Sequence, residues 1–312
     1  MAKKVKETKL VKSTGRKKSK SEKIVFGIVF TLFVAYAAFI LFFFVFAFLC
    51  ALRKDGMEFD IARSNHENLF SWPKNASFES FIKAFKTMEL INAGEDTFLS
   101  ITWNSIWRTT TYVFLSILTS SMVCYILVFY KSKFTRFLYN LGIFVAILPL
   151  YGTVASTVRF YNEIGFINNP FALITSIGLY GGYFFYMYSF YKSMSWDYAE
   201  AAFVDGASHF RVFFQIMMPM ALPSISALFV MSFIGAWNDY ESTILYMPAY
   251  PNLAYAVYAL DSVSRYENVI PSYLASVLIS LVPILVLFLI FQNSIMEKVH
   301  LGGLKGQIIS FI

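Results

Sequence analysis

EAAFVDGASHFRVFFQIMMPMALP, residues 200–223, is a polar interruption between two strongly apolar parts of the chain. Asp197 followed by Glu200 fits a capping box, which predicts a helix beginning just before the stretch. Gly206 predicts the end of that helix, because glycine adopts the left-handed conformation of a helix C-terminus at little cost. Ser208 predicts the N-cap of a second helix. The stretch therefore predicts two short helices joined by a sharp turn.

The second predicted helix carries an amphipathic stripe. Its apolar residues recur at i, i+3, i+4 and i+7, and they are Phe210, Phe213, Phe214 and Met217. Pro219 and Pro223 are predicted to end this helix and to lead into the next apolar segment. Two interpretations fit: a surface that another protein binds, or an interfacial segment with no partner. The pattern alone leaves both open.

The composition of the chain is that of an all-α integral membrane protein. Of its 312 residues, 57% are hydrophobic and only 14% are charged. A soluble domain of this length cannot bury so much apolar surface. A helix needs about 20 apolar residues to cross the hydrocarbon core. Six segments meet this requirement: Ile24–Leu52, Phe98–Tyr130, Phe134–Val158, Phe171–Tyr191, Pro223–Tyr246 and Pro271–Ile295.

The basic residues predict the orientation of these spans. Residues 1–23 contain ten Lys/Arg and two Glu, and the loop 131–136 contains three basic and no acidic residues. Because cytoplasmic loops carry the excess of Lys and Arg, both termini are predicted to be cytoplasmic. The basic tail is predicted to lie against anionic membrane lipid and not to bind nucleic acid. The predicted organisation is a tail at 1–23, a six-span domain at 24–296 and a cytoplasmic tail at 297–312, with an extracellular segment at 53–96 and a cytoplasmic loop at 192–222 between spans four and five.

Within the predicted extracellular segment, Ser77–Met88 has apolar residues at helical spacing behind a serine cap. We expect a short amphipathic helix there that lies on the bundle of spans.

The sequence carries no pattern typical of an enzyme. Cys50 and Cys124 both lie inside apolar runs, and the three histidines are far apart, so no metal site or disulfide framework is predicted. The phosphate-binding pattern G-x-x-x-x-G-K-[ST] is absent from the sequence, so we expect this chain not to bind ATP itself. No nucleophile–base pair stands out. We therefore predict no catalytic residue and no cofactor.

The opening stretch resembles the cytoplasmic EAA loop of ABC importer permeases. That pattern is Glu-Ala-Ala, three residues, Gly, nine residues, Ile, one residue, Leu and Pro. The matching residues are Glu200, Ala201, Ala202, Gly206, Ile216 and Pro219. Asp205 and Ala207 on either side of the glycine complete the Asp-Gly-Ala sequence usual in the carbohydrate branch. Met218 stands where the family has Leu, which is a volume-conserving replacement.

Other segments extend the resemblance over nearly the whole chain after residue 70. They are NASFESFIKAF at 75–85, WNSIWRTT at 103–110, the Pro-bearing segment 147–174, FIGAWNDY at 233–240 and HLGGLKG at 300–306. Together they are similar to the smaller, six-span permease of sugar importers. The resemblance implies the type I permease fold in a bacterial cytoplasmic membrane. It also implies a homologous permease in a heterodimer, two ATPase subunits and an extracellular solute-binding protein as partners.

In that family the EAA loop forms the coupling helix, which seats in a groove of the ATPase. The resemblance therefore assigns ATPase coupling to Glu200, Ala201, Ala202, Asp205, Gly206, Ile216 and Pro219. It predicts import of a carbohydrate, with an oligosaccharide favoured. Two alternatives remain: an importer permease for a peptide or polyamine, or an ion-coupled secondary transporter.

Polar residues within the spans are candidates for a substrate pathway. Candidate residues are Asn104, Trp237, Asn238, Asp239 and Tyr240, because a sugar pathway needs flat aromatic faces and hydrogen-bonding groups. Headgroup-level salt bridges and local packing are the alternative for this group. Arg108 is a further ionisable residue within a span, and such residues usually face a cavity or a partner. Arg159 and Glu163, four residues apart, are predicted to form a surface ion pair.

Overall fold

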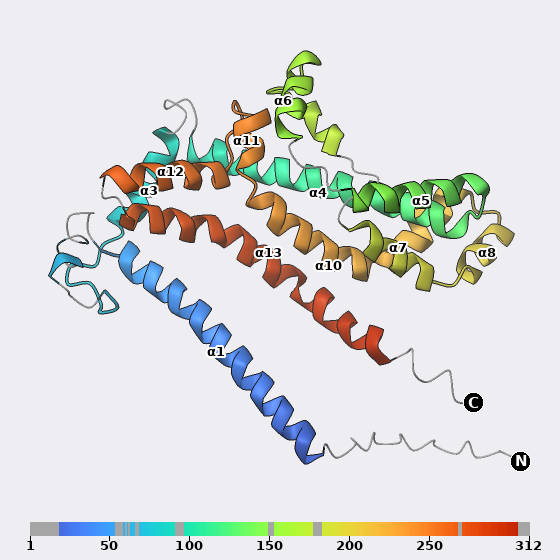
Figure 1. The fold of residues 1–312 in the computed structure, drawn as a ribbon, viewed down its shortest axis with the longest axis horizontal. Helices are drawn as coiled ribbons and strands as arrows, with labels where there is room; N and C mark the ends of the chain where they lie inside the picture. The colour runs from blue at the N-terminus through green and yellow to red at the C-terminus, as the bar shows by residue number, and fades with distance from the viewer. Residues whose placement is uncertain are drawn as a thin grey trace, which may run out of the picture.

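The structure is a computed structural model, and it describes residues 19–53, 59, 61, 63–65, 69–90, 97–148, 153–176, 183–267 and 270–304. These residues form helices and no strands, as the all-α prediction requires (Figure 1). The α-helices are α1 Lys20–Ala51, α3 Glu79–Leu90, α4 Phe98–Phe129, α5 Lys133–Ile147, α6 Val154–Glu163, α7 Phe184–Ser193, α8 Asp197–Val204, α9 His209–Val212, α10 Met218–Trp237, α11 Glu241–Tyr246, α12 Leu253–Glu267 and α13 Ile270–Leu304. A 3-10 helix spans Pro170–Ser176, and a π-helix spans Phe213–Met217.

Three of the six predicted spans are confirmed as single helices long and apolar enough to cross a membrane. They are α1, α4 and the Ile270–Gln292 part of α13. The pair His209–Leu222 and Ser224–Trp237 makes a fourth if the two bent pieces count as one span. The six-span count therefore remains a prediction.

The predicted third and fourth spans are each divided in the structure. In the third, α5 ends at Ile147 and α6 begins at Val154. Fifteen residues of α-helix extend only about 22 Å, which is less than the hydrocarbon thickness of about 30 Å. In the fourth, a 3-10 helix ends at Ser176 and α7 begins at Phe184. The residues between these pieces, 149–152 and 177–182, lie outside the described part of the chain.

The prediction that Pro219 and Pro223 end the second short helix is wrong. The helix continues from α9 through the π-helix into α10. Pro219 lies in the first turn of α10, where a missing N–H is tolerated. The chain bends by 73° between Leu222 and Ser224, so Pro223 redirects the helix and does not terminate it.

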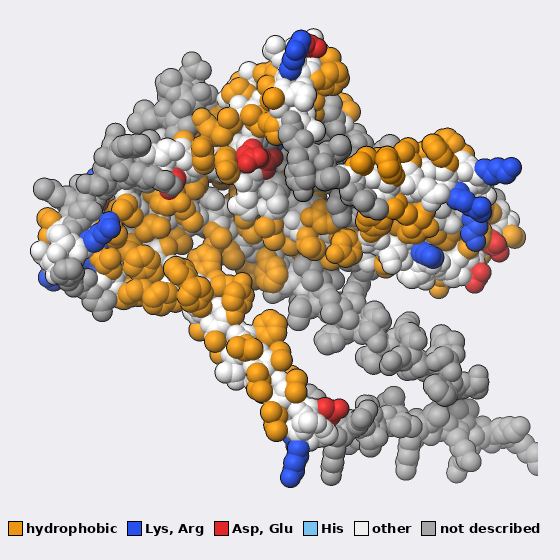
Figure 2. Space-filling model, viewed as in Figure 1, with side chains coloured by type: hydrophobic (Ala, Val, Ile, Leu, Met, Phe, Trp, Pro, Cys, Tyr) orange, Lys and Arg blue, Asp and Glu red, His pale blue; other side chains and the backbone are white. Residues whose placement is uncertain are grey.

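Helix α4 is the centre of the bundle, and it contacts α3, α5, α7, α10 and α12 (Figure 1). The main hydrophobic core forms around it, from the following buried residues among others: Val113, Ile117, Cys124, Phe184, Met187, Met217, Ala221, Leu228 and Leu260. Helix α1 differs, because its apolar side chains are exposed along most of its length (Figure 2). It contacts α13, and its buried residues lie at its C-terminal end. An apolar helix exposed on most faces is suited to contact lipid.

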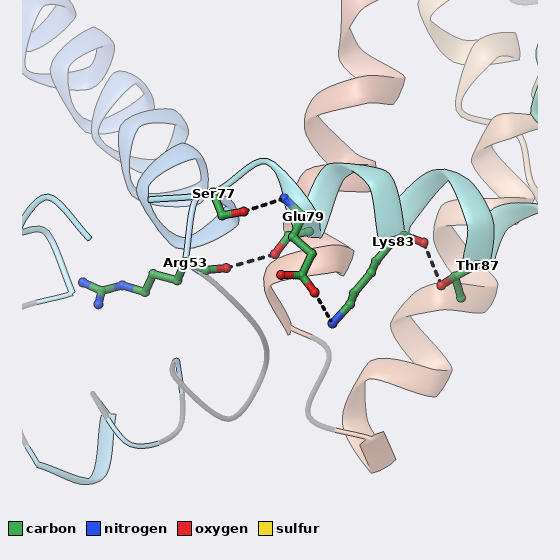
Figure 3. Close-up of polar contacts among 6 residues, drawn as sticks. Arg53, Ser77, Glu79, Lys83 and Thr87 are labelled. Carbon is green, nitrogen blue, oxygen red and sulfur yellow. Dashed lines mark hydrogen bonds and ion pairs between the residues drawn. The ribbon is translucent and has the colours of Figure 1, made fainter. Parts of the chain in front are cut away.

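The predicted amphipathic helix near residue 80 is confirmed as α3. Ser77 Oγ accepts a hydrogen bond from the Glu79 backbone N–H at 3.1 Å, and Glu79 pairs with Lys83 at 3.2 Å (Figure 3). The Ser80 hydroxyl donates to the Arg53 carbonyl at 3.0 Å, and this bond ties α3 to the end of α1.

Small residues allow α3 to approach the spans closely. Ala84 of α3 packs with Ala51 of α1 and Ala275 of α13, and all three are fully buried. The helix therefore lies on the bundle, as the sequence predicts.

Candidate functional site

The turn at Gly206 has the geometry that the sequence predicts. Gly206 has φ +80°, in the left-handed region. The Ala207 N–H donates to the Ala202 carbonyl at 2.9 Å, and the Gly206 N–H donates to the Phe203 carbonyl at 3.0 Å. These two bonds form a Schellman motif, which satisfies the last carbonyls of α8. Ser208 then caps α9, since its Oγ accepts from the Arg211 N–H at 3.4 Å.

The predicted capping box at Asp197 and Glu200 is wrong. The Asp197 N–H donates to Ser195 Oγ at 3.2 Å, so the serine is the hydrogen-bond acceptor for the first N–H group of α8. Trp196 is the N-cap residue, and it makes no side-chain cap bond. Glu200 is exposed on the surface of α8. Its carboxylate therefore faces away from the bundle, where a partner protein can reach it.

Aromatic rings attach the inner face of this segment to the C-terminal end of α4. Trp196 stacks on Phe129 with ring centroids 4.8 Å apart. Phe213 packs on Tyr125 at 5.0 Å, and His209 Nδ1 forms a hydrogen bond with the Tyr130 hydroxyl. The segment is thus held to α4 mainly by ring contacts.

The outer face of the segment exposes apolar side chains. Val204 is 87% exposed and Phe210 is 72% exposed, and the two lie on either side of the Gly206 turn. Tyr198 is also exposed. Of the predicted coupling residues, Ala202 is buried and Ile216 is half-buried, and the remainder are exposed: Glu200, Ala201, Asp205, Gly206 and Pro219. Large apolar residues raised on a rigid turn are typical of a protein-binding surface.

A second feature is a cavity of about 570 Å³ between α4, α10 and the segments around them. It is lined by Arg108, Thr109, Tyr112, Ser116, Tyr161, Ala172, Leu173, Tyr183, Ser232, Gly235, Ala236, Asp239, Ser242, Tyr246, Met247 and Asn252. Four of these residues are tyrosines, and two carry opposite charges. The lining therefore combines flat rings with hydrogen-bonding and charged groups.

Arg108 is the most strongly anchored polar residue of this cavity. It is only 5% exposed. Its Nη1 donates to Thr243 Oγ1 at 2.8 Å and to the Tyr250 carbonyl at 2.6 Å, and its Nη2 donates to Ser242 Oγ at 2.9 Å. Asp239 Oδ1 accepts from the Ser242 N–H at 3.0 Å, which places the carboxylate on the same wall. Arg108 stands out in the sequence as an ionisable residue within a predicted span. Its partners could not be predicted, because they lie more than 130 residues away.

The predicted pathway residues occupy different positions around this cavity. Asp239 lines it, whereas Asn104 and Trp237 are buried in packing beside it. Asn104 Nδ2 donates to the Pro251 carbonyl at 3.1 Å, and its Oδ1 accepts from Trp107 Nε1 at 3.0 Å. Trp237 Nε1 donates to the Ser280 carbonyl at 3.1 Å.

Asn238 makes a local contact within α10, whereas Tyr240 contacts α12. Asn238 Nδ2 donates to the Ile234 carbonyl at 2.8 Å, and the Tyr240 ring stacks on Tyr258 at 4.4 Å. The cavity tyrosines were not found from the sequence. Tyr112 could have been found, because it lies four residues after Arg108 and therefore on the same face of the helix.

The sequence of the chain matches a known protein family. Residues 112–295 match the family of binding-protein-dependent transport system inner membrane components. The match covers more than half of the chain, and the chain belongs to this family.

Two relatives and one solved structure are similar to the chain over most of its length. It is 28% identical to the diacetylchitobiose uptake system permease protein NgcG of Streptomyces coelicolor, over 76% of this chain and 77% of that protein. It is 26% identical to the arabinooligosaccharides transport system permease protein AraQ of Halalkalibacterium halodurans, over 66% and 74%. A chain of a bacterial ABC transporter involved in the import of the acidic polysaccharide alginate superposes with a TM-score of 0.69 at 17% identity, covering 88% of this chain and 98% of that one. The structural likeness extends the shared fold well beyond the residues of the family match.

Proposed function

We propose that this protein is the membrane-spanning permease subunit of an ABC importer for a carbohydrate, with an oligosaccharide favoured. The exposed helical turn at Glu200–Pro219 carries this proposal, because its sequence, its Gly206 geometry and its apolar outer face occur together in a chain of this family. The names of the relatives support a sugar, since they describe uptake of diacetylchitobiose and of arabinooligosaccharides.

The turn is proposed to seat in a groove of a separate ATPase subunit. Val204 and Phe210 would enter the groove, and Glu200 would approach it from the side of α8. The Phe129 end of α4 lies directly behind the turn, so a displacement of the turn reaches the core of the bundle through Trp196 and Phe213. The 73° bend at Pro223 then joins the same segment to the rest of α10, which lines the cavity.

Six spans with both termini in the cytoplasm are proposed for the membrane topology. Helices α5 and α8 lie at one end of the molecule, with α3 and α12 at the opposite end (Figure 1). The first end holds the basic loop 131–136 and the proposed coupling turn. This arrangement supports the orientation that the positive-inside rule gives. The remaining partners are proposed to be a homologous permease, a second ATPase subunit and an extracellular solute-binding protein.

The cavity beside Arg108 and Asp239 is proposed to lie on the substrate pathway. Its tyrosine faces offer stacking surfaces for sugar rings, and its charged and hydroxyl groups offer partners for sugar hydroxyls. Asn104 and Trp237 would support the wall from behind. Asn238 and Tyr240 would lie at the end of α10, beside Asp239.

One experiment tests both the transport class and the solute. The chain is purified from its native membrane, its co-purifying proteins are identified, and uptake is measured with and without an active ATPase. A bound ATPase and ATP-dependent uptake of an oligosaccharide would support the proposal. Uptake driven by an ion gradient in the absence of the ATPase would overturn it. A co-purifying solute-binding protein that binds a peptide or polyamine would overturn the sugar alone.

A further inference from the structure

A second cavity, of about 570 Å³, lies where α4 ends and α5 begins. Its lining is basic on one side, with Lys131, Arg136 and Lys192. Among the described residues that line it there is no carboxylate, and no ion pair is recorded for these three cations within the described chain. The lining of the cavity is therefore positively charged, and no described carboxylate pairs directly with its cations.

The loop that carries two of these cations is rigidly built. The Thr135 N–H donates to Ser132 Oγ at 3.0 Å, and the Ser132 N–H donates to Thr135 Oγ1 at 2.9 Å. The Thr135 hydroxyl also donates to the Tyr130 carbonyl at 2.8 Å. This reciprocal cap fixes the first turn of α5 against the end of α4, so the backbone of Lys131 and Arg136 is held beside the cavity.

The other wall of the cavity is apolar and aromatic. It is formed by Leu127, Val128, Phe129, Tyr139, Tyr188, Met194 and Trp196. Tyr139 and Tyr188 stack with centroids 4.6 Å apart. From this wall the outer face of α5 continues with exposed Phe134, Phe137 and Phe144. Figure 2 shows apolar side chains along α5, and basic side chains with acidic ones beside them at the end of the molecule where Figure 1 places α8.

We propose that this cavity binds the phosphate headgroup of an anionic phospholipid, whose acyl chains lie along α5. A phosphate group suits three cations without a carboxylate, and the apolar wall distinguishes a lipid from free phosphate. Trp196 lines the cavity and also stacks on Phe129, so a bound lipid stabilises the junction between α4 and the Glu200–Pro219 segment. The inference requires a membrane permease but does not depend on the solute carried.

The test uses the full transporter complex in nanodiscs of phosphatidylcholine with a small fraction of phosphatidylglycerol. Lipid retained after purification is measured for the wild type, for K131Q/R136Q/K192Q and for R63Q/K86Q/K133Q. The last variant loses the same charge outside the cavity lining. Each cavity cation is expected to contribute about a five-fold preference for the anionic lipid. The cavity variant should therefore lose its retained phosphatidylglycerol, and the control variant should keep it.

A second measurement does not require the cavity variant to fold. Brominated phosphatidylglycerol should quench part of the wild-type tryptophan emission, and that part should disappear in W196F. Equal retention by all three proteins, or quenching unchanged in W196F, would overturn the proposal. Full displacement of phosphatidylglycerol by millimolar inorganic phosphate would overturn the lipid proposal and assign the cavity to a soluble anion. Loss of the ATPase from the cavity variant with lipid retention unchanged would assign the cations to a protein contact instead.

Discussion

The two ends of α4 hold their neighbours by different means. At the Phe98 end, directional hydrogen bonds fix the segment 242–253: Arg108 binds Thr243, Ser242 and the Tyr250 carbonyl, and Ser105 Oγ accepts from the Leu253 N–H at 2.7 Å. At the Phe129 end, ring contacts predominate: Trp196 packs on Phe129 just before the Glu200–Pro219 segment, and Phe213 of the segment packs on Tyr125. Hydrogen bonds weaken steeply when their angle changes, whereas ring packing tolerates small rotations. We therefore expect the first end to be fixed and the second to adjust as the transporter works.

The largest effect is expected from Arg108→Met. The change removes the donor from the buried Thr243 hydroxyl and from two partly buried acceptors, and loss of a buried partner costs about 1–3 kcal/mol. The detergent-solubilised protein should unfold at a markedly lower temperature, and its abundance in the membrane should fall. Arg159→Met is the control, because Arg159 is exposed and pairs only with Glu163 four residues on in the described structure. Equal stability of the two variants would show that the Arg108 bonds do not fix this end.

Gly206→Val should abolish coupling while leaving the bundle intact. At φ +80° a β-branched residue is strained by more than the 1–2 kcal/mol roughly typical of L-residues. A Cβ at this position would meet no atom within 4 Å, so the expected cost is in the backbone alone. ATPase association and substrate-stimulated ATP hydrolysis should be lost at normal membrane abundance. Gly206→Asn should retain most of both, because Asn tolerates the left-handed region. A valine variant with full transport would remove the main support for the coupling assignment.

Phe129→Leu should produce a smaller, partial defect. The substitution keeps an apolar side chain but removes the stacked pair with Trp196, which is worth about 0.5–1.5 kcal/mol beyond area burial. We expect normal abundance and normal ATPase binding, with fewer solute molecules moved per ATP hydrolysed. Phe134→Leu, on the exposed face of α5, is the matched control for ATP coupling. If Phe129→Leu moves as many solute molecules per ATP as the wild type, the rings hold the Glu200–Pro219 segment but do not transmit its movement.

The smallest effect on stability is expected from Glu200→Ala. Since Ser195 makes the side-chain bond to the first turn of α8, loss of the Glu200 carboxylate should change the stability by less than about 0.5 kcal/mol. Any defect should therefore appear in affinity for the ATPase, measured by titrating one purified partner with the other. A clear drop in thermal stability would show that Glu200 supports the helix after all.

Sequence reasoning worked where the cause is local. The left-handed turn at Gly206, the Ser208 cap and the amphipathic helix α3 depend on residues close together in the chain, and all three are confirmed. The surface pair of Arg159 and Glu163 is confirmed for the same reason.

Sequence reasoning failed where distant segments decide the outcome. The Arg108 bonds and the tyrosine-lined cavity require knowing which segment packs on α4, and no local pattern encodes that. The prediction for Pro223 was wrong because a proline can bend a helix as well as end it, and here the chain bends by 73°. The capping box failed for a local reason. In a capping box the Glu200 carboxylate would accept from the Asp197 N–H, but Ser195 Oγ accepts from that N–H instead.

The π-helix at Phe213–Met217 has a consequence for how this segment tolerates changes in length. In an α-helix each residue advances the chain by about 100° around the axis. A π-turn holds one residue more than an α-turn over about the same rotation, so deleting one residue from Phe213–Met217 would convert the wide turn to α-helix and leave the Gly206 turn at nearly the same angle relative to α10. An added residue would have to widen the turn further or rotate the Gly206 turn by roughly 100°. The segment is therefore expected to tolerate the loss of one residue better than the gain of one.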